Sequence, residues 1–212
     1  MNSMPQTKSE QDANYPWGSY VLRPLALRVV PDSPKLSANT VTWIGFGIGL
    51  LGCVGLGFGG YWYAIIGAAL LNISLFVDHI DGVVARVTGT ESLYGKWLDG
   101  FSGYTLEVLM PIAIGIGMMD YSIYYLILGV GYAFIRCFVR LLASYHTKVF
   151  GENIASWGNA NWLYKTGMLS LSLELPLLLM SAITLSLDIF LAVFILANLG
   201  ELGVIIWKSV RR

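Results

Sequence analysis

Three aspartates stand out in a chain whose long stretches are otherwise apolar: Asp78, Asp81 and Asp99. The first two are three residues apart, which places them on one face of a helix. Asp99 follows a short polar turn, so an antiparallel helix would bring it back beside them. Carboxylates that converge at one depth repel each other unless a cation lies between them, and oxygen ligands favour a hard ion. The pattern therefore predicts a site for Mg²⁺ or Mn²⁺.

Small residues accompany these aspartates. Gly82, Ala85 and Gly95 leave the backbone open to close approach by a diphosphate. Magnesium commonly binds carboxylates together with substrate phosphates, and it neutralises the charge that develops as a phosphate-linked group departs. The arrangement thus indicates phosphoryl transfer. In the other interpretation, the aspartates only pair with Arg86 and Lys96 to hold helices together, although helices pack in lipid without such costly devices.

The composition predicts that these residues lie in an integral membrane protein. Of the 212 residues, 56% are hydrophobic and 12% are charged, whereas soluble domains carry about 25% charged residues. The net charge of zero gives no indication of nucleic-acid binding. A membrane-spanning helix needs about 20 mostly apolar residues. We therefore expect an all-α protein with six transmembrane helices: Val41–Gly60, Tyr61–Val84, Leu93–Met118, Ser122–Ser144, Lys165–Thr184 and Leu187–Trp207.

The distribution of basic residues predicts the orientation of these spans. The turns near Tyr61, Asp120 and Ser186 contain no lysine or arginine, whereas the other turns and both termini do. This asymmetry places both termini and the aspartates on the cytoplasmic side. Residues 1–19 are polar and are expected to form a cytoplasmic tail before a membrane domain at 20–212. The beginning of that domain alternates basic and apolar residues, which is typical of an interfacial helix or of an ordinary basic flank.

The segment 78–86, DHIDGVVAR, followed by Gly95 and Asp99 at fixed spacing, resembles the signature of the CDP-alcohol phosphotransferases. Upstream, the segment 37–42, SANTVT, resembles the family's start of the first helix, with Ala38 in place of a proline. The resemblance implies six transmembrane helices, an interfacial N-terminal helix and a polar cavity open to the cytoplasm. Members of the family often form homodimers, so a homodimer is compatible with the resemblance.

The resemblance also implies an activity: transfer of a phosphate-linked group from a CDP-alcohol to an alcohol acceptor, with release of CMP. It implies that Asp78, Asp81 and Asp99 bind the divalent metal. We favour CDP-diacylglycerol as the donor, membrane lipids as the surroundings, and the cytoplasmic membrane of a bacterium or archaeon as the location. The residues that the resemblance assigns to the CDP moiety are Asn39, Asp78, Asp81, Gly82, Ala85, Arg86 and Gly95.

The sequence departs from the signature at Gly103, where the family has a fourth aspartate that is its proposed general base. Glu107 lies one turn further along the same face, about 5.4 Å deeper, and is one candidate base. Asp99 is the other residue that we assign to catalysis. His79 is a candidate by its intrinsic pKa, but it points off the face of the first two aspartates. Alternatively, the acceptor needs no base, or activity has been lost. Because positioning and electrostatics contribute more than general-base help, we expect a working but atypical enzyme.

Two arginines four residues apart, Arg136 and Arg140, share one face of a predicted span. Guanidinium groups suit phosphate or carboxylate, so this pair is a candidate anion site for the acceptor. Pairing with Glu107, Glu174 or Glu201 is the competing interpretation.

Two functions other than catalysis are also compatible with carboxylates inside a membrane protein. An ion carrier would place them along a transit path, but here the acids gather at the cytoplasmic end and the outer halves of the spans are nearly free of charge. A structural membrane protein is the other rival. Release of CMP that depends on a divalent ion would distinguish an enzyme from both.

Overall fold

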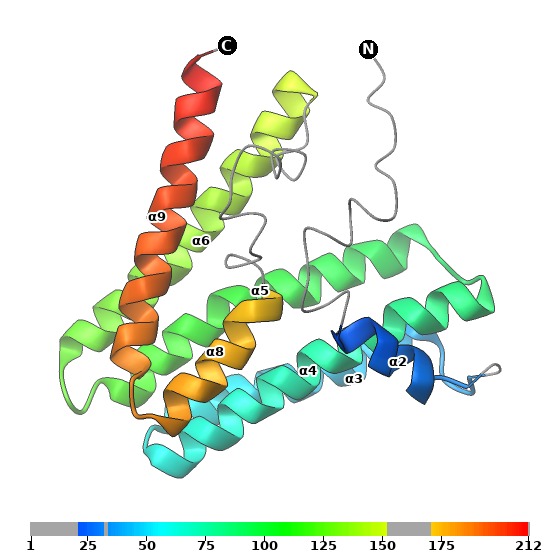
Figure 1. Ribbon diagram of the computed structural model, residues 1–212, viewed down its shortest axis with the longest axis horizontal. Helices are drawn as coiled ribbons and strands as arrows, with labels where there is room; N and C mark the ends of the chain where they lie inside the picture. Colours follow the sequence, from blue (N-terminus) through cyan, green and yellow to red (C-terminus); the bar gives the residue numbers. More distant parts are fainter. Residues whose placement is uncertain (1–20, 32–33, 152–170, 212) are drawn as a thin grey trace.

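The computed structural model describes residues 21–31, 34–151 and 171–211. Within these residues all regular secondary structure is helical, as predicted, and Figure 1 shows how the helices are arranged. The helices are α2 (Arg23–Val29), α3 (Ala38–Phe58), α4 (Tyr61–Thr88), α5 (Leu93–Met118), α6 (Ile123–Phe150), α8 (Leu171–Ile183) and α9 (Leu187–Val210).

Five of the described helices are long and apolar enough to cross a membrane. This identifies an integral membrane protein, but the predicted count of six spans is not established. The fifth expected span, Lys165–Thr184, begins outside the described residues, and its described part is α8, a helix of 13 residues with Pro176 inside it. The five candidate spans are Ala38–Phe58, Tyr61–Thr88, Leu93–Met118, Ile123–Phe150 and Leu187–Trp207.

The short helix α2 lies where the sequence predicted an interfacial helix. Leu22 and Ala26 are buried, and α2 packs against α4. Leu25, Leu27 and Val29 remain between 44% and 61% exposed. Exposed leucine and valine on a helix anchored by its other face suit contact with lipid, so a position at the membrane surface stays our prediction. The predicted tail, residues 1–19, lies outside the described residues.

Local signals reverse the chain between α4 and α5. Gly89 ends α4 in the left-handed conformation, with a φ of 64°, which glycine adopts without strain. Three residues later the Ser92 side chain accepts a hydrogen bond from the backbone N–H of Gly95 and caps α5. The turn is short, so the first residues of α5 lie beside the last residues of α4. This places Asp99 opposite Asp81.

Small residues bring α3 and α4 close together. A Cβ added at Gly52 would lie 2.9 Å from the carbonyl oxygen of Gly67, and one added at Gly45 would lie 3.0 Å from Val77. Glycines allow such close approach of helix backbones in membranes. Because the two helices are this close, side chains at the start of α3 reach the end of α4, where the aspartates lie.

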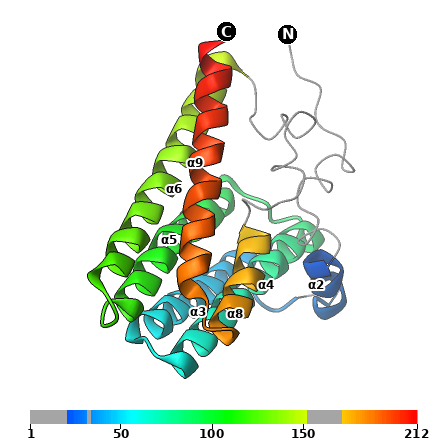
Figure 2. The same ribbon diagram turned by 60° about the vertical axis from the view of Figure 1, so that its left-hand side comes forward.

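The apolar core joins α3, α4, α5, α6, α8 and α9. Leu71, Met110, Tyr132, Leu178 and Leu191 are each at most 1% exposed and belong to one cluster. Figures 1 and 2 show α6 and α9 side by side, with their ends extending away from the α3–α5 layer. On α4 and α5 the core residues lie at 64–75 and 106–118, toward the helix ends that are remote from the turn between these two helices.

Candidate active site

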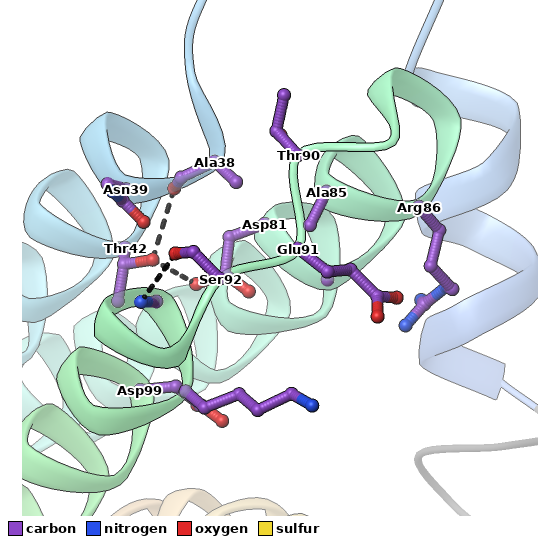
Figure 3. Close-up of a pocket in the computed structure, with 13 residues that line it drawn as sticks. Ala38, Asn39, Thr42, Asp81, Ala85, Arg86, Thr90, Glu91, Ser92 and Asp99 are labelled. Carbon is purple, nitrogen blue, oxygen red and sulfur yellow. Dashed lines mark hydrogen bonds between the residues drawn. The ribbon is translucent and has the colours of Figure 1, made fainter.

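A pocket of about 180 Å³ lies between the start of α3, the end of α4 and the start of α5 (Figure 3). Its walls come from three helices and from the turn at 89–92. Every residue that the sequence assigned to the metal or the CDP moiety lines it, except Asp78. Those that line it are Asn39, Asp81, Gly82, Ala85, Arg86, Gly95 and Asp99.

Thr42 orients Asp81 at the bottom of this pocket. Its hydroxyl donates to Asp81 Oδ2 at 2.5 Å and also lies 3.1 Å from the carbonyl oxygen of Ala38. A hydroxyl has one hydrogen, so the shorter contact to the carboxylate dominates. Asp81 is 8% exposed and lines the pocket, and the backbone N–H of Gly82 also bonds to its carboxylate. Thr42 belongs to the segment 37–42 that resembles the family's start of the first helix, but that resemblance assigned it no role.

The three aspartates occupy one region, but they do not form a complete metal-ligand cluster. Asp78 lies within hydrogen-bonding reach of Asp99, and the charge of Asp81 also acts on it. Two carboxylates this close repel unless a proton or a cation lies between them, and their oxygens suit a hard divalent ion. However, in the described part of the chain no three acidic, histidine or cysteine side chains are arranged to hold a metal ion. The carboxylate oxygens suit such an ion, but one of the three aspartates would have to move to complete its coordination.

Two glycines shape the walls of the pocket. A Cβ at Gly95 would lie 3.2 Å from Asn39 Oδ1 and equally far from Ser92 Oγ. A Cβ at Gly82 would lie 3.3 Å from Nη1 of Arg86, so the guanidinium folds back over this glycine. Each glycine thus allows a polar side chain to lie directly against a helix backbone.

The position of the missing fourth aspartate is open space. A Cβ added at Gly103 would meet no atom within 4 Å, and Gly103 lies one helical turn beyond Asp99 on α5. The two other candidates for a base are placed elsewhere. His79 is not among the residues that line the pocket, and its Nδ1 lies 2.9 Å from the carbonyl oxygen of Leu75. Since a carbonyl only accepts, Nδ1 carries the hydrogen.

Glu107 is buried, at 5% exposed, and is held by two arginines. Arg140 donates to its Oε1 at 2.6 Å and to its Oε2 at 3.1 Å, while Arg136 donates to Oε2 at 3.3 Å. Charge-assisted bonds to two arginines are strong and stabilise the ionised carboxylate, which makes Glu107 a poor proton acceptor.

Arg136 is the centre of a buried network that joins four helices. Besides Glu107 it donates to Asn198 at 3.1 Å and to Glu174 at 3.3 Å, and the hydroxyl of Tyr132 donates to Glu174. The predicted alternative of pairing with glutamates is thus observed for Glu107 and Glu174. Arg140 differs, since its side chain is 43% exposed and its guanidinium lies 5.5 Å from the ring centre of Tyr104.

Arg136→Met is expected to lower the free energy of unfolding by about 3–5 kcal/mol, because Glu107 and Glu174 would remain buried without their shared cation. Thermal unfolding in detergent measures this. Arg140→Met is the matched control and should cost less, since that side chain is half-exposed. Equal losses in the two variants would contradict a special role for the buried guanidinium.

A family model for CDP-alcohol phosphatidyltransferases matches residues 35–206, which include α3 to α6, α8 and most of α9. A membrane-embedded transferase is the class of protein that this family match and the membrane-spanning helices indicate. The chain belongs to the CDP-alcohol phosphatidyltransferase family. The family transfers a phosphatidyl group from a CDP-alcohol to an acceptor, so a CDP-alcohol, an alcohol and membrane lipid are the partners it implies. No curated protein matches the chain.

Proposed function

We propose that the pocket between α3, α4 and α5 binds a CDP-alcohol and that the chain transfers its phosphate-linked group to an alcohol, releasing CMP. The observation that carries this proposal is the convergence of Asp81, Asp99, Arg86 and Asn39 on one pocket in a chain of this family. CDP-diacylglycerol is our preferred donor. Apolar side chains exposed on α2 and on the long helices suit a donor that carries acyl chains.

The aspartates have a proposed role in holding the diphosphate. We assign Asp78, Asp81 and Asp99 to a divalent ion, Mg²⁺ or Mn²⁺, which when bound neutralises charge on the diphosphate. The contact between Asp78 and Asp99 supports this assignment, because two adjacent carboxylates need a cation or a proton between them. Thr42 donates to one oxygen of Asp81 and thereby restricts the orientation of this carboxylate at the pocket.

The acceptor, in this proposal, approaches α5 beyond Asp99. Gly103 leaves open space there, and the exposed edge of Arg140 is available to an anionic acceptor. The contacts of Glu107 favour a role in positioning Arg140 over a role as proton acceptor. Among the accounts of the missing aspartate, we therefore favour a reaction without a general base in contact with the acceptor, which proceeds more slowly than a reaction with one.

The activity is tested with purified protein, a panel of CDP-alcohols and several acceptors, by following CMP. We expect release of CMP from CDP-diacylglycerol in Mg²⁺ or Mn²⁺ and its loss in EDTA. If a lipid instead supplies the hydroxyl group, the protein should release CMP faster from a CDP-alcohol with a soluble headgroup than from CDP-diacylglycerol. Failure of every donor to release CMP, together with ion flux in liposomes, would replace this proposal with an ion carrier.

Thr42→Val is expected to lower the rate of CMP release about tenfold or more, because it removes a hydrogen bond to a charged group without changing the side-chain shape. Initial rates at saturating donor measure the effect. Thr40→Val is the matched control, since the Thr40 hydroxyl contacts only Ser37 among the described residues. A Thr42 variant as active as this control would show that Asp81 needs no orienting partner.

A further inference from the structure

Arg140 differs from its partners in the buried network because its side chain reaches the surface. It is 43% exposed, whereas the side chains of Arg136, Glu107 and Glu174 are at most 6% exposed. The Nε and Nη2 atoms of Arg140 donate to Glu107 and hold the guanidinium in one orientation. Its Nη1 makes no hydrogen bond to a described residue, so the two N–H groups of this atom are available to a ligand.

The negative charge of the network lies mainly around Arg136. Glu174 pairs with Arg136, and the charge of Glu201 also acts on it. Glu107 is the carboxylate that acts on Arg140, and it is shared with Arg136. Arg140 therefore receives only part of the charge of one carboxylate. An arginine in a membrane-spanning helix is costly without a nearby anion or polar group, so its exposed edge favours a further anion.

Aromatic side chains place Arg140 close to the membrane surface. Its guanidinium lies 5.5 Å from the ring centre of Tyr104, and both Tyr104 and Trp97 are exposed on α5. Exposed tyrosine and tryptophan on membrane helices are typical of the level of the lipid headgroups. The length of α6 agrees with this level, because the roughly 20 residues that cross the hydrocarbon, counted from Ile123, end near Leu142.

The surface of α6 beside Arg140 is apolar. Cys137 and Leu141 are exposed within one helical turn of Arg140, and Phe134 is exposed about one turn deeper. Guanidinium groups match the geometry of phosphate oxygens, and acyl chains below such a phosphate would cover the apolar side chains. This combination fits a phospholipid better than a water-soluble anion, which would leave the apolar surface uncovered.

We propose that Arg140, with Tyr104 beside it, binds the phosphate of a membrane phospholipid whose acyl chain lies along the exposed face of α6. The lipid belongs to the leaflet next to the turn between α4 and α5, which is the cytoplasmic leaflet in the predicted orientation. The site goes beyond the proposed function and does not rest on it, because it needs neither a nucleotide nor a divalent ion. An anionic acceptor that used the same edge of Arg140 would compete with the lipid.

The test measures binding of short-chain phosphatidylglycerol to the full chain in nonionic detergent, without a donor or a divalent ion. Arg140→Gln should weaken binding about tenfold to a hundredfold, the usual effect of losing a hydrogen bond to a charged group. Lys148→Gln is the matched control, because it removes one positive charge from an exposed position about two turns further along α6. Equal weakening in both variants would mean nonspecific attraction to anionic lipid and would overturn the inference.

Tyr104→Leu tests the site without removing the bonds between Arg140 and Glu107, which matters if Arg140→Gln does not fold. Loss of the ring should weaken binding of phosphatidylglycerol about twofold to fivefold, the usual effect of an exposed cation–π contact. Tyr104→Phe keeps the ring and should bind as the unaltered chain does. If Tyr104→Leu also bound the lipid like the unaltered chain, the ring would not belong to the site and the proposal would fail.

Glycerol phosphate, which is the headgroup without acyl chains, separates a lipid from a soluble anion. We expect it to displace much less phosphatidylglycerol than an equal concentration of unlabelled lipid does. Displacement as effective as that by the lipid would assign the edge of Arg140 to a soluble anion and reject a phospholipid site. Diacylglycerol lacks the phosphate and should bind equally to the unaltered chain and to Arg140→Gln. Lipid binding that depends on Arg140 in a chain that releases no CMP would reject the proposed function and keep this site.

Discussion

Asp99→Asn is expected to reduce the rate of CMP release from a CDP-alcohol by about 100-fold to 1,000-fold, the effect of losing one preorganised electrostatic contact in a reacting site. Asp99 is exposed in the pocket and lies within reach of Asp78. Asparagine keeps the shape of the side chain and removes its charge, so metal affinity should fall together with the rate. Initial rates across a range of Mg²⁺ concentrations, with Mn²⁺ binding followed by electron paramagnetic resonance, measure both effects.

Asp120→Asn is the matched control for this experiment. Asp120 is exposed in the turn between α5 and α6, away from the pocket residues, so its loss should leave rate and metal binding unchanged. If Asp99→Asn retained full activity and full affinity for Mn²⁺, Asp99 would not be a metal ligand. The assignment of the three aspartates to one ion would then fail.

Gly103→Asp is expected to raise the rate of CMP release about 100-fold, the lower end of what a general base typically contributes. The structure gives the new side chain room, since a Cβ at Gly103 meets no atom within 4 Å. The carboxylate would lie one turn beyond Asp99 and would not compete with Glu107, whose oxygens are already held by Arg136 and Arg140. The rate constant of CMP release in a single-turnover experiment measures the chemical step.

Gly103→Asn separates the charge from the size of the new side chain. It fills the same space without a carboxylate, so it should not reproduce the gain. A decrease of similar size in both variants would mean that the acceptor occupies the space at Gly103, and the idea of a vacant base position would be wrong. An increase in Gly103→Asp alone would support it.

The pocket could be predicted because its determinants are local. The spacing of Asp78, Asp81 and Asp99, the left-handed glycine at 89 and the serine cap at 92 are all properties of short segments. Together they place the end of α4 beside the start of α5, whereas the third wall of the pocket, from α3, depends on helix packing. The family signature added the roles of the residues, and the match over residues 35–206 confirmed the family.

The network around Glu107, in contrast, depends on contacts between helices that are distant in the sequence. The sequence offered Glu107 as a base and Arg136 and Arg140 as an anion site, with mutual pairing as an alternative. Only the packing of α5 against α6 brings these three side chains within hydrogen-bonding distance. Periodicity places residues on a helix face, but it does not say which face of another helix will meet it.

By itself, then, the sequence determined that this is a helical membrane protein with three acids on two consecutive helices that a short turn connects, because hydropathy and spacing act over a few residues. The tertiary structure decided which polar side chains meet across helices: Thr42 with Asp81, and Arg136 with Glu174. It also separated the described α8, at 13 residues, from the five longer helices. Contacts between residues distant in the chain depend on how helices pack, and single-residue patterns do not encode that packing.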